Sequence, residues 1–218
     1  MPLVGAFDVA MGLSVLFRPI GALVLYMTAW CVWTALLRPL AGESSWEAVE
    51  RAGNYGVPLA LFLLMQGGDA KTWLRGRWPL DGSQCRGIDW VLRLTTVLLL
   101  VGHGALGLFV RKPMFCAQYA LLGLPGATVE PLVGGFECLL ALAVLLKPTP
   151  WLLLGVVLWK LITEALCPLA GSPVWVFVEH GGSYAAPLAL AFSLLKQSEI
   201  QSGPLPSRAS ERQFTTPP

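Results

Sequence analysis

The segment Val49-Glu50-x-x-Gly53-x-Tyr55-x-x-Pro58-Leu59-Ala60-Leu61 recurs 129 residues later as Val178-Glu179-x-x-Gly182-x-Tyr184-x-x-Pro187-Leu188-Ala189-Leu190. At this offset residues 5–64 align with 134–193 without a gap, and 24 of the 60 pairs are identical. The apolar composition of the two segments would by itself align scattered leucines, whereas here proline, tryptophan, glutamate and tyrosine align. The sequence therefore predicts an internal duplication.

The composition is that of a membrane protein. Of the 218 residues 55% are apolar and 13% are charged, and the mean hydropathy is +0.64. An average soluble domain is about a quarter charged, and one soluble core could not bury this much apolar surface. We therefore expect the lipid bilayer to surround much of the chain. The net charge of +2 is small and no basic stripe is present, so nucleic acid is not an expected partner.

Seven apolar stretches follow one another along the chain, at 3–17, 20–37, 52–66, 89–110, 131–146, 150–166 and 181–196. They predict an all-α fold, a polytopic transmembrane bundle of about seven helices. Several stretches are shorter than the roughly 20 residues of a straight span, but short connections such as Arg18-Pro19 let neighbouring helices share the interfacial zone. The alternative for 3–17 and 131–146 is a re-entrant or interfacial helix.

The positions of the basic residues predict the orientation. With seven spans, nine Lys and Arg residues fall on one side of the membrane and four on the other. The side with more positive charge is expected to be cytoplasmic, which places the N-terminus outside and the C-terminus inside. A plasma or inner membrane is favoured over an organelle membrane. No basic segment precedes residue 17, which argues against a cleaved signal peptide.

The duplication divides the chain into four parts. Residues 1–66 form a three-helix first repeat, 67–88 a cytoplasmic loop, 89–196 a four-helix second repeat, and 197–218 a polar tail expected to be disordered. Four helices separate each span from its repeat mate, so both repeats cross the membrane in the same direction. The predicted axis between them is normal to the membrane. The first repeat lacks a mate for the helix 89–110.

The second repeat carries a recognisable succession of motifs. A helix with Arg93 and Gly102-His103-Gly104 leads to the loop Gly123-Leu124-Pro125-Gly126, and the next helix begins Gly134-Gly135-Phe136-Glu137 and ends Leu146-Lys147-Pro148. This succession resembles the DoxX-like family of small four-helix membrane proteins. The resemblance covers 89–196 and, through the repeat, residues 4–66.

The resemblance implies a four-helix unit that associates with redox-linked or quinone-linked membrane complexes. We therefore expect a non-catalytic subunit or accessory protein, with other membrane proteins as partners and a quinone as the one cofactor to consider. One branch of the family is the small subunit of a thiosulfate:quinone oxidoreductase. Two features depart from the family: the unit is duplicated here, and no set of residues identifies a thiosulfate site.

Four ionisable residues lie well inside predicted spans, where such groups usually face the bundle interior. At 1.5 Å per residue, His103, Glu137 and Glu164 all lie about 20 Å above the cytoplasmic edge, with Lys160 one turn below Glu164. The functional interpretation is a shared polar site that binds a small polar ligand or a quinone head group, or that relays protons. The structural interpretation is polar pairing that fixes helix packing.

The repeated motif contributes paired positions: Glu50 and Glu179, Tyr55 and Tyr184, and Pro58 and Pro187. Because both glutamates precede predicted helices, we expect them to cap helix N-termini rather than bind a ligand. The prolines predict kinks.

Cysteine and histidine give no metal or haem motif. Of the five cysteines, Cys116 and Cys167 are predicted to lie outside, where they would be able to form a disulfide; two unpaired thiols are the alternative. The two histidines, His103 and His180, are predicted at different depths. No catalytic motif is present, so intrinsic enzyme activity is not expected. A small-molecule carrier or an assembly protein is the alternative function, because parallel repeats also build transporters.

Overall fold

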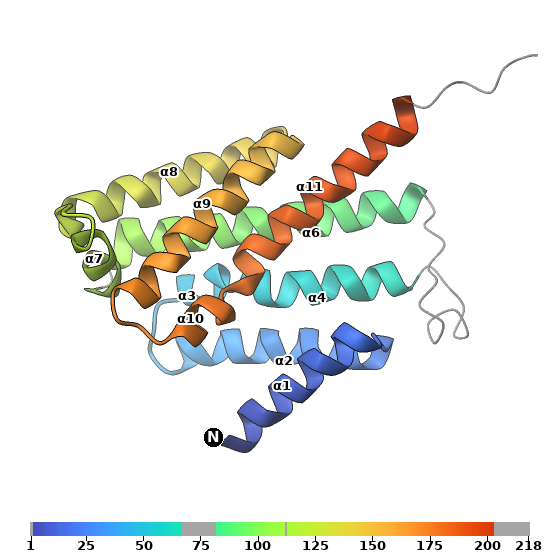
Figure 1. The fold of residues 1–218 in the computed structure, drawn as a ribbon, viewed down its shortest axis with the longest axis horizontal. Coiled ribbons are helices and arrows are strands. Elements are labelled where there is room, and N and C mark those ends of the chain that lie inside the picture. The colour runs from blue at the N-terminus through green and yellow to red at the C-terminus, as the bar shows by residue number, and fades with distance from the viewer. Residues whose placement is uncertain (1, 67–81, 112, 203–218) are drawn as a thin grey trace, which may run out of the picture.

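The computed structural model describes residues 2–66, 82–111 and 113–202 (Figure 1). The described residues form helices and no strand, which confirms the predicted all-α class. The helices are α1 (Pro2–Phe17), α2 (Gly21–Leu40), α3 (Trp46–Glu50), α4 (Ala52–Met65), α6 (Gly82–Ala105), the π-helical turn η1 (Leu106–Val110), α7 (Pro113–Ala120), α8 (Gly126–Leu146), α9 (Pro150–Leu169), α10 (Val174–Glu179) and α11 (Gly181–Ser202).

Four of the described helices are long and apolar enough to cross a membrane: Gly21–Leu40, Arg86–Val110, Gly126–Leu146 and Pro150–Leu169. The stretch predicted at 131–146 thus belongs to a helix of full spanning length. The stretch 3–17 and α4 are shorter apolar helices. Large apolar side chains cover the outer surface of the bundle, as with Trp151 at 80% exposure, and lipid accounts for such exposure in a transmembrane helix.

Two helices are interrupted at matching places. Arg51 separates α3 from α4 with backbone angles φ −78° and ψ 10°, and His180 separates α10 from α11 with φ −82° and ψ 13°. The short helix α3 leads directly into α4, and the short helix α10 leads directly into α11 (Figure 1). These breaks do not lie at Pro58 and Pro187, from which kinks were predicted. Both prolines lie inside α4 and α11, which continue past them, and the kinks stay a prediction.

Helix α6 lies at the centre of the bundle. It packs against α3, α4, α8 and α11, while α9 packs against α11, and α1 packs mainly on α2 at the edge (Figure 1). Leu99 and Leu100 of α6 are fully buried among Val156 of α9 and Leu190 of α11. This arrangement places the C-terminal part of α6, including His103, between both parts of the duplicated sequence.

Two predicted boundaries were wrong. Helix α6 begins at Gly82, inside the predicted loop 67–88, and α11 continues to Ser202, inside the predicted tail 197–218. Two hydrogen bonds join α6 and α11 close to these ends: Gln197 Nε2–H donates to Asp89 Oδ2 at 2.6 Å, and Ser193 Oγ–H donates to Asp89 Oδ1 at 2.5 Å. The rest of the loop, 67–81, and of the tail, 203–218, lies outside the described residues.

Candidate functional site

A group of six ionisable side chains occupies the interior where α6 meets the two interrupted helices. We call it the polar cluster; its members are Glu50, His103, Glu137, Lys160, Glu164 and His180. Lys160 is fully buried, and Glu137 and Glu164 are 2% and 1% exposed. Charged groups this deep in a bundle need charged or hydrogen-bonding partners, and the cluster supplies them from five helical segments.

Lys160 links the two carboxylates predicted from the sequence. Its Nζ lies 3.0 Å from Glu164 Oε1, one turn away on α9, and 3.4 Å from Glu137 Oε1 on α8. Trp159 Nε1–H also donates to Glu137 Oε1 at 3.1 Å. The structure therefore brings Glu137, Lys160 and Glu164 together.

His103 joins this group from α6. Its Nε2 lies 3.2 Å from Glu164 Oε1 and 2.9 Å from Glu50 Oε1, and its Nδ1 lies 3.8 Å from Glu137 Oε2. The glycines beside it explain how α6 comes so close. A Cβ on Gly102 would lie 2.2 Å from the Glu50 backbone nitrogen, and one on Gly104 would lie 2.6 Å from the Gly134 carbonyl oxygen. Small residues permit this backbone approach.

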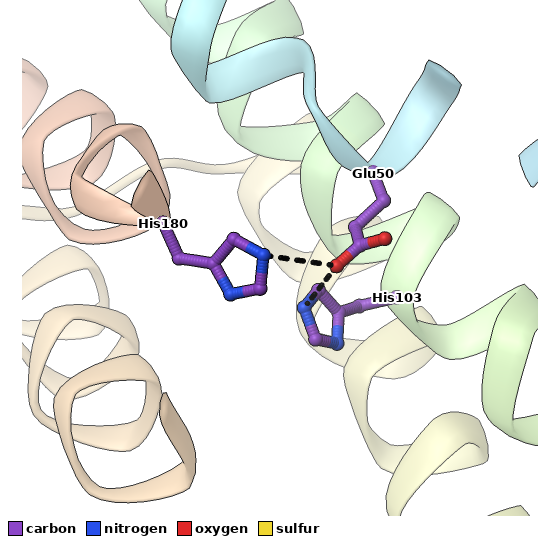
Figure 2. Close-up of side chains that lie close together, drawn as sticks. All are labelled: Glu50, His103 and His180. Carbon is purple, nitrogen blue, oxygen red and sulfur yellow. Dashed lines mark ion pairs between the residues drawn. The ribbon is translucent and has the colours of Figure 1, made fainter. Parts of the chain in front are cut away.

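His180 completes the cluster, contrary to the prediction that the two histidines lie at different depths. Its Nδ1 lies 2.5 Å from Glu164 Oε2 and its Nε2 lies 3.9 Å from Glu50 Oε1. The two imidazole centroids are 6.2 Å apart. Figure 2 shows Glu50, His103 and His180 pointing toward one another from separate segments. The prediction failed because it placed residue 180 at the outer end of a span, whereas the chain breaks there inside the bundle.

The capping role predicted for Glu50 and Glu179 was also wrong. Glu50 ends α3, and its carboxylate faces His103 instead of free backbone amides. Glu179 is 43% exposed and forms an ion pair with Arg51, while Arg38 Nη2 lies 4.0 Å away.

The paired tyrosines have a structural role. Tyr55 O–H donates to the Ala48 carbonyl at 3.3 Å, and Tyr184 O–H donates to the Phe177 carbonyl at 2.9 Å. Each bond ties a long helix to the short helix before it. The tyrosines therefore stabilise the two helix breaks rather than face a ligand.

Cys167 is a buried free thiol, and its Sγ accepts a hydrogen bond from Gln118 Nε2 at 2.7 Å. This agrees with the alternative of unpaired thiols. The side chain of Cys116 lies outside the described residues.

A second feature is a groove of about 670 Å³ between α1, α2, α4 and the α10–α11 break. Its polar lining residues are Asp8, Thr34, Arg38, Arg51, Asn54 and Glu179. The cavity beside the polar cluster holds only about 20 Å³ and borders His103, Glu137 and Glu164. That volume is about enough for one water molecule, so the cluster is closed and the groove is open.

The groove and the cluster are lined by aligned residues of the two repeats. Asp8 aligns with Glu137, Cys31 with Lys160, Arg51 with His180, and Glu50 with Glu179. The groove is lined by Asp8, Cys31, Arg51 and Glu179. Their aligned counterparts, Glu137, Lys160, His180 and Glu50, belong to the cluster. His103 has no aligned counterpart, because α6 occurs once in the chain.

No protein-family model, curated protein or solved structure matches the chain.

Sequence reasoning found four of the six cluster residues and missed Glu50 and His180 as members. A partial signal was the short length of the apolar stretches at 52–66 and 181–196, which the uninterrupted stretches at 3–17 and 131–146 share. Short spans at corresponding positions of two repeats often mark interrupted helices, whose ends line binding sites.

Proposed function

We propose that the chain is a seven-span membrane protein, built as a tandem parallel repeat of a DoxX-like unit, that serves as a non-catalytic subunit of a redox-linked membrane complex. In this proposal α3 with α4, and α10 with α11, each form one interrupted span. The remaining spans are α1, α2, α6, α8 and α9. Its N-terminus lies outside and its C-terminus in the cytoplasm, in a plasma or inner membrane.

Matching local contacts support the repeat. The tyrosine bonds described above join aligned atoms in the two halves. The ends of α2 and α9 also correspond: Gly42 and Gly171 have φ of 91° and 93°, and their amides donate to Pro39 and Pro168 at 3.1 Å in both cases. Glycine adopts this left-handed conformation without steric cost.

The observation that carries the subunit proposal is the contrast between the closed cluster and the open groove. A carrier needs a hydrated path between its halves, whereas a subunit needs a surface that a partner can occupy. The cavity at the cluster is about 20 Å³, and the groove is about 670 Å³. The groove is the better candidate for a macromolecular contact.

The kind of partner follows from the aligned faces of α1 and α8. On α8, the residues Gly134, Glu137, Ala141 and Val144 are buried, and α8 packs against α6. On α1, the aligned residues Gly5, Asp8 and Gly12 are exposed, and Val15 is half-buried. A Cβ on Gly5 or Gly12 would meet nothing within 4 Å. The face that α8 uses to bind a helix is thus bare on α1.

The occupant that fits is a transmembrane helix of a partner membrane protein. It would lie on α1 as α6 lies on α8. Small residues would face Gly5, and a polar side chain would face Asp8, because an unpaired charge inside the bilayer is costly.

Site-specific photo-crosslinking in the cells that make this protein tests the proposal. A photoreactive residue at Val15 or Leu61 in the groove should form an adduct with one partner, and peptide mapping should locate that adduct in a transmembrane helix. The same residue at Leu158, which is 60% exposed on α9, should not form that adduct. Adducts with lipid alone, or with a second copy of this chain, would contradict the proposal.

Two substitutions on α1 form a matched pair for this experiment: one should block the partner, and the other is its control. Gly5→Leu fills open space on the bare face and should abolish the Val15 adduct without affecting the fold. Ala6→Leu lies on the opposite side of the same exposed helix and should leave the adduct unchanged.

A small-molecule carrier is the second candidate, favoured by the two interrupted helices at matching positions. Solvent-accessible thiol labelling distinguishes the two functions. In a carrier, cysteines introduced along α4 and α11 should react from both sides of the membrane. In a subunit they should react near one end only. The quinone stays a prediction, because no described contact argues for it.

A further inference from the structure

Three potential metal-ligating atoms converge inside the polar cluster. Glu50, His103 and His180 each offer one donor atom, and these three atoms lie within 4.8 Å of one another (Figure 2). They come from α3, α6 and the break between α10 and α11, so they are far apart in the sequence. No helix supplies two of them.

The separations fit a metal ion without a large rearrangement. Metal–ligand bonds of about 2.1 Å in tetrahedral geometry place donor atoms about 3.4 Å apart. Glu50 Oε1 lies 2.9 Å from His103 Nε2 and 3.9 Å from His180 Nε2. One separation is slightly shorter than the ideal value and the other slightly longer.

The surrounding carboxylates orient the imidazoles as metal ligands require. A ligating histidine almost always donates its second ring N–H to a carboxylate, carbonyl or water. His180 Nδ1 lies 2.5 Å from Glu164 Oε2, and His103 Nδ1 faces Glu137 Oε2 at 3.8 Å. In each case the other nitrogen, Nε2, is the atom nearest Glu50.

The charge of the cluster favours a divalent cation. With both histidines neutral, as metal ligation requires, the three carboxylates Glu50, Glu137 and Glu164 face one ammonium, Lys160, which leaves two negative charges. The nearby Arg51 and Glu179 pair with each other. A buried site is most stable when its charges balance, and one divalent cation balances this one.

We propose that Glu50, His103 and His180 bind one divalent first-row transition metal ion inside the membrane bundle. Two imidazoles and one carboxylate suit zinc and non-haem iron, and three protein ligands leave at least one coordination position open. Glu164 and Glu137 act as positioning residues for the two histidines, and Lys160 holds both carboxylates in place.

Cobalt titration tests the site directly. The full chain, purified in detergent with a tag free of histidine and stripped with a chelator, is titrated with Co²⁺. We expect one Co²⁺ per chain with the visible absorption of a low-coordinate nitrogen–oxygen site, and displacement by Zn²⁺. Wild-type protein that develops no such absorption would overturn the proposal.

Variants assign the ligands. His180→Asn keeps an N–H for Glu164 but loses the metal-ligating nitrogen, so the Co²⁺ absorption should disappear. Glu164→Gln should weaken Co²⁺ binding about 10- to 100-fold, the usual effect of removing an orienting partner. Glu43→Gln, an exposed carboxylate paired with Arg38, should bind Co²⁺ as the wild type does. An unchanged spectrum in folded His180→Asn protein would overturn the assignment.

A measurement on wild-type protein covers the case in which the variants do not fold. The chain contains only two histidines, so their reaction with diethyl pyrocarbonate, read by mass spectrometry, reports on the site alone. Zn²⁺ should protect His103 and His180 together and at one concentration. Protection of neither, or of one without the other, would contradict a shared ion.

Discussion

Gly53 and Gly182, which occupy aligned positions of the two repeats, pack backbone against backbone. A Cβ on Gly53 would lie 2.4 Å from the Gly182 carbonyl carbon, and a Cβ on Gly182 would lie 2.3 Å from the Gly53 carbonyl carbon. Contact between two residues at aligned positions is consistent with the proposed axis between the two repeats, which would pass between them. The packing of α4 against α11 accompanies the approach of Glu50 and His180, which precede these helices and lie 3.9 Å apart.

The first prediction concerns this crossing. Gly53→Ala and Gly182→Ala should each destabilise the protein by about 1–3 kcal/mol, because the new methyl group meets backbone that cannot move aside alone. Thermal unfolding in detergent measures the effect. Gly155→Ala on α9 is the control: its Cβ would meet nothing within 4 Å, so only the better helix propensity of alanine remains. Equal stability of all three variants would contradict the observed crossing.

A second prediction compares two aligned glycines. Gly134→Ala should loosen the α6–α8 contact, because its Cβ would lie 2.6 Å from the Gly104 carbonyl oxygen. Gly5→Ala should leave the purified chain at least as stable as the wild type, because its Cβ would lie in open space. Chemical denaturation of both variants in detergent provides the comparison. A loss of stability in Gly5→Ala equal to that in Gly134→Ala would mean that α1 is also packed on that face.

A third prediction separates hydrogen bonding from charge at Glu137. Glu137→Gln should harm folding less than Glu137→Leu, because the amide oxygen still accepts from Trp159 and Lys160. Leucine leaves both donors buried without this partner, at a cost of about 1–3 kcal/mol for a neutral group and more for a charged one. The yield of monodisperse protein and its unfolding temperature report the difference. Equal damage by both variants would show that the charge itself is needed.

The fourth prediction concerns orientation. With the other cysteines replaced, Cys85 should react with a membrane-impermeant maleimide only when the cytoplasmic side is accessible. A cysteine introduced at Ser44 should react only from outside, since an odd number of spans separates the two positions. Everted vesicles and intact cells give the two directions of access. The reverse pattern of labelling would invert the predicted topology.

The sequence alone determined the helical class, most helix positions and four members of the cluster. These features follow from local information: apolar runs set the helices, and an ionisable residue inside such a run is visible without a structure. His103, Glu137, Lys160 and Glu164 could be selected for this reason. Their common depth followed from the fixed rise of a helix.

Only the tertiary structure decided that Glu50 and His180 belong to the same cluster. Glu50 ends α3 and His180 directly follows α10, and both side chains point toward His103 (Figure 2). Whether a helix continues or breaks there depends on its packing against segments more than 100 residues away, such as α4 against α11. The sequence pattern of one segment does not reveal that long-range contact. The six groups can therefore be recognised as one site only in the tertiary structure.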